Sequence, residues 1–139
     1  MTQVALPEVL RLRMIEEARA AFPGECCGLL EGARAEQGDG FHITALHPAR
    51  NLACAKDRFE IAPQDHIQAL KAARANGRRL IGCYHSHPQG HAQPSPADAR
   101  GAGEEDFLWL IAAGEELAAF VYRRGAFCEA ELVAPQWGR

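Results

Sequence analysis

The chain has 139 residues, of which 47% are hydrophobic and 24% are charged, and its formal net charge is −3. These values suit one soluble globular domain spanning residues 1–139 and leave little room for a second. The small negative charge gives no electrostatic reason to expect nucleic acid or an anionic membrane as a partner, and no apolar run approaches the roughly 18 residues of a membrane-spanning helix.

The cysteines argue against a disulfide-stabilised protein. Their number is odd, their spacing is uneven, and no Cys-x-x-Cys occurs: they are Cys26, Cys27, Cys54, Cys83 and Cys128. A disulfide framework and a four-cysteine zinc site are therefore disfavoured, and we expect buried free thiols in a reducing cytosol. The N-terminus has no basic region followed by an apolar core, which favours a cytoplasmic protein without a secretory signal.

The first third of the chain predicts a helix followed by two strands. Apolar residues at helical spacing favour a helix over residues 4–22, which Pro23 and Gly24 end. A continuous apolar run predicts a buried strand over residues 25–31. Residues 32–40 are polar and rich in glycine, which predicts a loop, and alternation predicts a second strand over residues 41–47.

The rest of the chain predicts two more helices and more strands. We expect a loop over residues 48–51 and a short strand over residues 57–61, then a helix over residues 63–76 that Asn76 and Gly77 stop. The later elements are a strand ending near Pro88, a short helix from Pro96 to about Gly103, and strands over residues 107–113, 117–122 and 126–133. This order predicts a single α/β domain with a mixed, mostly antiparallel sheet flanked by helices.

The stretch Gly82-Cys83-Tyr84-His85-Ser86-His87-Pro88 carries the first chemical signal. Successive side chains of a strand point to opposite faces, so His85 and His87 should point the same way. Pro88 lacks the N–H that a further ladder bond needs, so the strand should stop there.

Ser95-Pro96-Ala97-Asp98 has two interpretations. Serine at the N-cap, proline at N1 and an acid at N3 form a helix start resembling a capping box, which accounts for Ser95 and Asp98 without any chemistry. Asp98 also follows His87 closely enough to join the two histidines as a metal ligand. Two imidazoles and one carboxylate leave a fourth position open for water, which is typical of a catalytic zinc site.

Glu25 opens the apolar run of the first predicted strand. An isolated glutamate at such a position is usually a solvent-exposed strand end. A zinc hydrolase, however, needs a general base that is not itself a ligand, and Glu25 is the candidate.

The combination of these motifs resembles the JAMM (MPN-plus) metalloprotease family, in its small stand-alone bacterial form. The matching blocks are Glu25-Cys26-Cys27-Gly28-Leu29-Leu30, then His85-Ser86-His87-Pro88, then Ser95 and Asp98, and the resemblance covers about residues 7–133. It implies a domain of the MPN/JAB type, related to the cytidine-deaminase fold. It also implies Zn²⁺ on His85, His87 and Asp98, with Glu25 as the general base and Ser95 as an oxyanion donor. No metal or base position departs from the family pattern.

The resemblance also suggests a substrate. The chain lacks a second cysteine–histidine cluster such as some polyubiquitin-specific relatives carry, so we expect a peptidase or isopeptidase that cuts after the C-terminal Gly-Gly of a ubiquitin-like sulfur carrier of the ThiS/MoaD type. A cell-wall or phage-tail peptidase and a non-catalytic, metal-stabilised binding scaffold remain alternatives. Cytidine deamination is disfavoured, because the chain has neither His-x-Glu nor Pro-Cys-x-x-Cys.

Several residues near these motifs stay open at this stage. His42 and His47 are expected to be surface or packing residues rather than ligands. His91, Cys27 and Cys83 lie close to proposed site residues in the sequence, and alternation places Cys83 with His85 and Cys27 with Glu25. Whether these three line the pocket, and what the oligomeric state is, does not follow from the residues.

Overall fold

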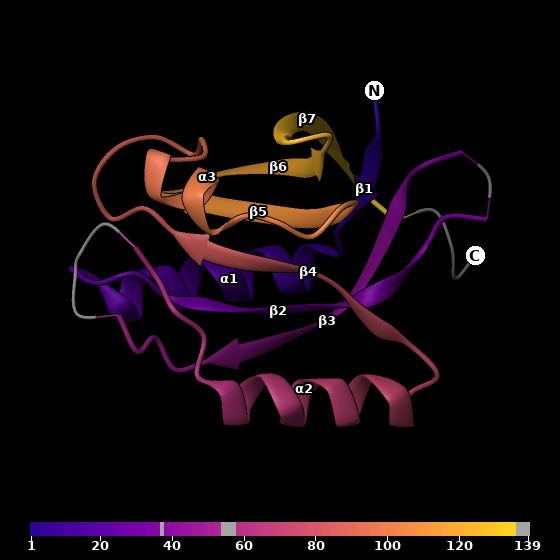
Figure 1. The fold of residues 1–139 in the computed structure, drawn as a ribbon, viewed down its shortest axis with the longest axis horizontal. Coiled ribbons are helices and arrows are strands. Elements are labelled where there is room, and N and C mark those ends of the chain that lie inside the picture. The colour runs from indigo at the N-terminus through magenta and orange to yellow at the C-terminus, as the bar shows by residue number, and fades with distance from the viewer. Residues whose placement is uncertain (37, 54–57, 136–139) are drawn as a thin grey trace.

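A seven-stranded sheet closes on itself in the computed structural model, which describes residues 1–36, 38–53 and 58–135 (Figure 1). The strands follow one another in the order β1-β3-β2-β4-β5-β6-β7. Three pairs are parallel (β1–β3, β1–β7 and β4–β5) and four are antiparallel (β2–β3, β2–β4, β5–β6 and β6–β7). Their bounds are Gln3–Ala5, Cys27–Arg34, Phe41–Ala49, Arg79–Ser86, Phe107–Ala113, Glu116–Arg123 and Ala126–Val133, for β1 to β7. The predicted α/β class with a mixed sheet is confirmed.

The two long helices bury opposite faces of the sheet. Helix α1 (Glu8–Ala21) contributes Leu10 and Met14 to a core cluster that includes Leu30 of β2 and Tyr84 of β4. Helix α2 (Pro63–Ala75) contacts β2, β3 and β4, and its Ala69 belongs to the other cluster. Adjacent residues of one strand therefore serve different cores, as the alternation of side chains in a strand requires. No helix in the described part of the chain is long and apolar enough to span a membrane.

The prediction of a helix over residues 4–22 is wrong at its beginning. Val4 and Ala5 lie in β1, where they pair with β3 on one side and β7 on the other, and Val4 is fully buried. Pro7 has an extended backbone (φ −60°, ψ 142°) and precedes the first helical residue, Glu8. Pairing that closes the sheet outweighs the local helical pattern at these two residues.

Further strand predictions differ from the structure. Strand β2 begins at Cys27, two residues later than predicted, and continues to Arg34, so the predicted loop over residues 32–40 begins too early. Strand β3 continues through Pro48 to Ala49. The strand predicted over residues 57–61 is wrong for its described residues, which form a single bridge between Asn51 and Ile61. Asp57 lies outside the described residues. Two backbone hydrogen bonds, Leu52 N–H to Glu60 O and Ala62 N–H to Arg50 O, join the segments there, and the Asn51 side chain adds further contacts.

The cysteine prediction is only partly correct. Cys27 and Cys83 are buried free thiols, but Cys26 is half-buried and Cys128 is exposed; Cys54 lies outside the described residues. Burial raises the pKa of Cys26 to about 11 and that of Cys27 to about 12, so these two thiols are poor nucleophiles at neutral pH.

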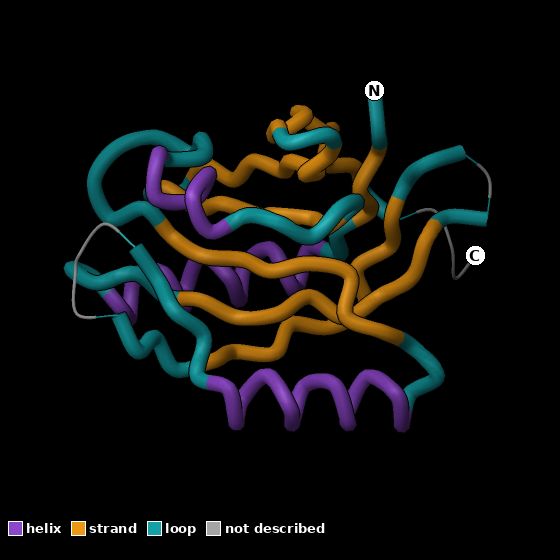
Figure 2. The backbone as a smooth tube through the Cα atoms, in the orientation of Figure 1, coloured by secondary structure: helices purple, strands orange, loops and turns teal. Residues whose placement is uncertain are grey.

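The start of β2, the ends of β3 and β4, and the loop that leads to α3 meet at one end of the sheet (Figure 2). Because β2 is antiparallel to both β3 and β4, the start of β2 lies beside the ends of these two strands. The short helix α3 (Pro96–Gly101) follows the loop after β4. Glu25, Asn51, His85, His87 and Asp98, far apart in sequence, are thereby brought to one place.

Candidate active site

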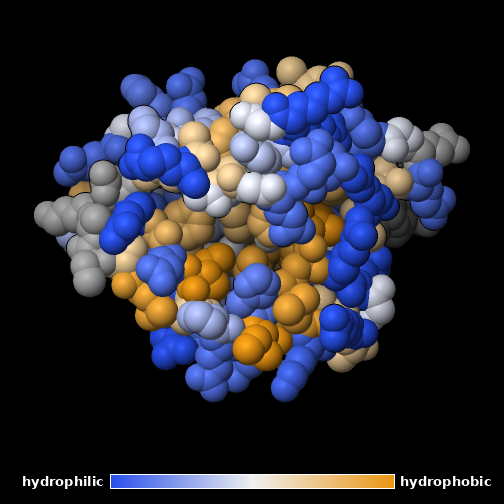
Figure 3. All heavy atoms as spheres, in the orientation of Figure 1, coloured by the Kyte–Doolittle hydropathy of each residue, from blue (hydrophilic) through white to orange (hydrophobic). Residues whose placement is uncertain are grey.

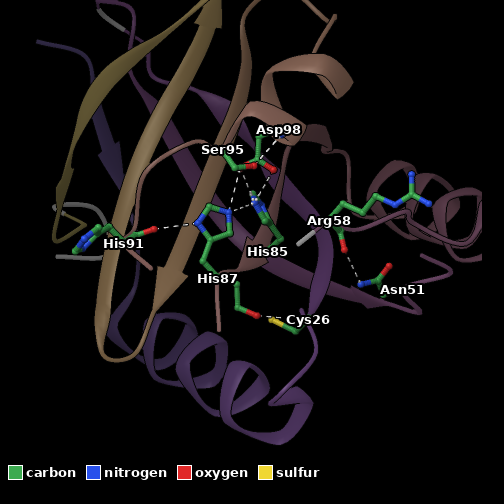
Figure 4. Close-up of polar contacts among 9 residues, drawn as sticks. Cys26, Asn51, Arg58, His85, His87, His91, Ser95 and Asp98 are labelled. Atoms are coloured by element: carbon green, nitrogen blue, oxygen red, sulfur yellow. Dashed lines mark hydrogen bonds and ion pairs between the residues drawn. The ribbon is translucent and has the colours of Figure 1, made fainter. Parts of the chain in front are cut away.

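Three candidate ligand atoms converge at the end of β4 (Figure 4). The Nε2 atoms of His85 and His87 are 3.0 Å apart, and Asp98 Oδ2 is 3.1 Å from each of them. His85 is the last residue but one of β4, while His87 lies just beyond the end of the strand and stays attached to the sheet through its N–H, which donates to Ala112 O at 2.7 Å. The two histidines thus face one point, as their spacing predicts.

A backbone contact orients the imidazole of His87. Its Nδ1–H donates to the carbonyl oxygen of His91 at 2.9 Å. This bond turns the ring so that the other nitrogen, Nε2, faces His85 and Asp98. A hydrogen bond on the far ring nitrogen is the usual way in which a protein fixes the tautomer of a metal-binding histidine.

The start of α3 places the carboxylate. Ser95 Oγ accepts a hydrogen bond from the Asp98 N–H at 3.0 Å, and the Ser95 N–H donates to Asp98 Oδ2 at 2.9 Å. This reciprocal pair is the capping box predicted from the sequence. The same Oδ2 atom approaches both histidines, so the hydrogen bonds that cap α3 also direct the Asp98 carboxylate toward the imidazoles.

Burial and hydrogen bonding set the charges of the cluster. His85 is fully buried and Asp98 is 3% exposed. Burial lowers the pKa of His85. Burial opposes charge on His87 as well, but its bonds to Asp98 and to the His91 carbonyl outweigh this and raise its pKa. Burial disfavours the Asp98 carboxylate, yet the hydrogen bonds from both histidines hold its pKa well below the usual range. The carboxylate is therefore ionised at neutral pH.

The donor set fits a zinc ion. The ligand atoms of His85, His87 and Asp98 all lie within 4.8 Å of one another. Ligands about 2.0 to 2.1 Å from a tetrahedral zinc would be about 3.3 Å apart, close to the separations found here. Two imidazoles and one carboxylate are also the ligand types of catalytic zinc sites, which keep one position open.

Glu25 lies next to this cluster. In the antiparallel β2–β4 pair, Cys27 is opposite His85, and the same register continued by two residues places Glu25 opposite His87. The Glu25 charge also contributes to raising the pKa of His87. Glu25 is only 6% exposed, so the interpretation as a solvent-exposed strand end is wrong.

The comparisons with known proteins agree with this geometry. Residues 7–124 match the family described as prokaryotic homologs of the JAB domain. The chain belongs to the prokaryotic JAB-domain family. The family resemblance inferred from the sequence motifs is thus confirmed.

Two named relatives and one solved structure are similar to this JAB domain. It is similar to a desampylase of Haloferax volcanii (33% identity over 97 residues, 69% of this chain and 67% of that protein). It is also similar to a probable TtuB-protein conjugate cleaving protease of Thermus thermophilus (37% over 93 residues, 64% of this chain and 59% of that protein). The solution structure of a Desulfitobacterium hafniense protein superposes with a TM-score of 0.83 at 30% identity, covering 97% of this chain and 93% of that one.

Two groups around the JAB-domain site escaped the sequence analysis. Phe59 stacks on the His85 ring, with centroids 4.4 Å apart, and Asn51 holds the segment that carries Phe59. Only Asn51 has a local signal: its Oδ1 accepts the N–H of Ala53 at 2.9 Å, an Asx-turn of the kind that asparagine favours. The aromatic stacking depends on tertiary structure and leaves no pattern in the sequence.

A cavity of about 260 Å³ adjoins the cluster on the side of α2. Asp98, Cys83, Phe59 and Trp109 are among its lining residues, so Cys83 does face the pocket. Figure 3 shows apolar side chains gathered above α2 around the hollow on this face. The Cys27 thiol instead lies 3.7 Å from Ala49 O.

The remaining histidines have other roles. His47 Nε2 lies 2.8 Å from Glu31 Oε1, away from the cluster, in agreement with its expected packing role. The part of His91 that contacts the site is its backbone oxygen, and its side chain is exposed.

Proposed function

We propose that this JAB domain is a zinc-dependent isopeptidase that cuts after the C-terminal Gly-Gly of a ubiquitin-like protein of the sulfur-carrier type. The observation that supports it most directly is the approach of His85, His87 and Asp98 beside Glu25, which combines a metal ligand set with a carboxylate that is not part of it. That combination suits hydrolysis of an amide.

Zn²⁺ held by His85, His87 and Asp98 would polarise the substrate carbonyl and lower the pKa of water. Glu25 accepts the proton of the attacking water and passes it to the leaving amine. The hydroxyl of Ser95 donates a hydrogen bond to the developing oxyanion. The two roles of Ser95 are compatible, because capping uses an oxygen lone pair as acceptor and leaves the O–H as donor.

The names of the relatives support the substrate class. A desampylase and a protease that cleaves TtuB-protein conjugates both suggest small ubiquitin-like proteins joined to other proteins. We extend this to the present chain, with the bond after the terminal Gly-Gly as the one that is cut. The assignment of a sulfur carrier as the substrate rests on analogy with the family.

The test uses a ubiquitin-like protein with a C-terminal Gly-Gly, joined to the lysine side chain of a fluorescent peptide. The zinc-loaded wild-type chain should release the peptide, and chelation should stop release until Zn²⁺ is restored. Glu25→Gln should retain zinc, measured by native mass spectrometry, and lose about 100- to 10,000-fold in kcat, the usual contribution of a general base. Full activity of the chelated protein or of Glu25→Gln would contradict the mechanism.

The binding-scaffold alternative makes a different prediction for the same samples. If the metal only stabilises the fold, zinc should raise Tm and His85→Ala should abolish this rise, while no conjugate is cut. Hydrolysis by the wild-type chain rejects that alternative.

A further inference from the structure

The peptide group between Glu25 and Cys26 is held at both of its polar atoms by side chains. Its carbonyl oxygen accepts a hydrogen bond from Asn51 Nδ2 at 3.1 Å. Its N–H donates to Ser86 Oγ at 2.9 Å. This peptide lies just outside β2, where no regular ladder fixes its plane, so the two side chains set its orientation.

Ser86 connects this peptide directly to the ligand cluster. It is the residue between His85 and His87, and it is 3% exposed. Its N–H donates to the Cys26 carbonyl at 3.2 Å, and its hydroxyl also forms a hydrogen bond with the Cys26 thiol. The position of Glu25 is therefore coupled to the end of β4, where Ser86 lies between the two histidines.

Asn51 connects the same peptide to the segment that packs against the His85 ring. Its Nδ2 also lies 3.5 Å from Arg58 O, and its Oδ1 accepts the N–H of Glu60 at 2.9 Å. These two contacts bracket Phe59, whose ring stacks on His85. Figure 4 shows the contact between Asn51 and the Arg58 carbonyl oxygen. One amide side chain thus joins the backbone of the proposed base to the segment that packs against a proposed ligand.

We propose that Asn51 and Ser86 are positioning residues that clamp the Glu25–Cys26 peptide and so aim the Glu25 carboxylate at the metal centre. The clamp rests on the proposed function for its effect on catalysis, but its hydrogen bonds can be tested without it. A base displaced by about 1 Å can lose about 100-fold in rate, so small movements of this peptide matter.

The variants separate the two ends of the clamp. Ser86→Ala removes the acceptor of the Cys26 N–H. Asn51→Asp keeps an oxygen for the N–H groups of Ala53 and Glu60 but removes the donor to the Glu25 carbonyl, whereas Asn51→Ala removes both. Asn76→Ala is the matched control: Asn76 Nδ2 also donates to a buried acidic residue, Glu31, at 3.1 Å, far along β2 from Glu25.

The catalytic readout is the split between kcat and KM on the fluorescent conjugate. Ser86→Ala and Asn51→Asp should lower kcat about 10- to 100-fold with little change in KM and full zinc content. Asn76→Ala should keep the wild-type kcat. Wild-type kcat in both clamp variants, or loss of zinc together with activity, would overturn the proposal.

Amide hydrogen exchange of the metal-free proteins is the readout that does not need activity. Exchange at Cys26 should quicken in Ser86→Ala, and exchange at Glu60 should quicken in Asn51→Ala but stay slow in Asn51→Asp. Unchanged exchange at both positions rejects the clamp. A wild-type chain that cuts no conjugate rejects the proposed function, and the exchange rates then decide the clamp alone.

Discussion

His87 is oriented by His91 through the backbone and not through the side chain. The 2.9 Å bond runs from His87 Nδ1 to the His91 carbonyl oxygen, and the His91 imidazole is exposed. The loop after β4 thus orients His87 through a backbone carbonyl group rather than through a side chain. His91 is therefore not among the residues whose side-chain ligand atoms come together, which are His85, His87 and Asp98.

Replacing His91 tests this relationship. Because the carbonyl remains, His91→Ala should bind zinc with wild-type affinity and keep the wild-type kcat. His87→Ala should lose zinc. Affinity is measured by competition with a chromophoric chelator. A clear loss of zinc affinity in His91→Ala would show that the imidazole itself reaches the metal.

Ser95 allows capping and catalysis to be separated. Ser95→Ala removes both the acceptor for Asp98 N–H and the hydroxyl donor, and should cost about 0.5 to 2 kcal/mol of stability as well as about 100- to 1000-fold in kcat. Ser95→Gly should cost only a few tenths of a kcal/mol, because glycine is tolerated at the N-cap, but it also lacks the hydroxyl. Urea unfolding and kcat are measured on both, with zinc content as the control.

Equal kcat losses in the two variants, despite their different stabilities, would support the oxyanion role. If kcat instead follows stability, so that Ser95→Gly is almost fully active, then Ser95 acts only as a helix cap.

The sequence predicted the site better than it predicted the strands around it. His85, His87, Ser95 and Asp98 lie in short segments whose spacing already restricts their geometry, and the structure brings them together. For Glu25 the sequence offered only a candidate base, because its place opposite His87 depends on the β2–β4 register, which joins segments far apart in the chain. Asn51 and Phe59 act through tertiary contacts that no periodicity encodes. Strand β1 was missed because its pairing partners are β3 and β7, remote in the chain.

Glu17 should make folding pH-dependent. Burial raises its pKa above the ordinary value of 4.5, against opposing effects of Tyr84, whose hydroxyl donates to Oε1 at 2.7 Å, and of Arg13. A carboxyl whose pKa is higher in the folded state contributes stability that is present below its unfolded pKa and is lost as the pH rises through its folded pKa. At pH 7 the buried charge of Glu17 therefore opposes folding.

Glu17→Gln should remove this penalty while keeping an oxygen that accepts from Tyr84. We expect its Tm to exceed that of the wild type at pH 7, with the difference shrinking as the pH falls through the raised pKa of folded Glu17 and no longer changing below about 4.5, its ordinary value. Taking the difference between the two proteins cancels acid effects at other carboxylates. A difference that is constant from pH 4 to pH 7 would show that Glu17 does not titrate with a raised pKa.

Gly28 should be intolerant of any side chain, because the Tyr84 ring occupies the space. A Cβ at Gly28 would clash with both Cζ and Oη of Tyr84, whose ring is fully buried and whose hydroxyl donates to Glu17. Gly28→Ala should therefore cost about 1 to 3 kcal/mol in urea unfolding, as overpacked cores do. Gly103→Ala is the control, since nothing lies within 4 Å of its Cβ position, and it should stay within about 0.5 kcal/mol of wild type. Tyr84→Phe removes one of the clashing atoms, so Gly28→Ala should cost less in that background. Equal costs in the two backgrounds would place the strain elsewhere than at the tyrosine hydroxyl.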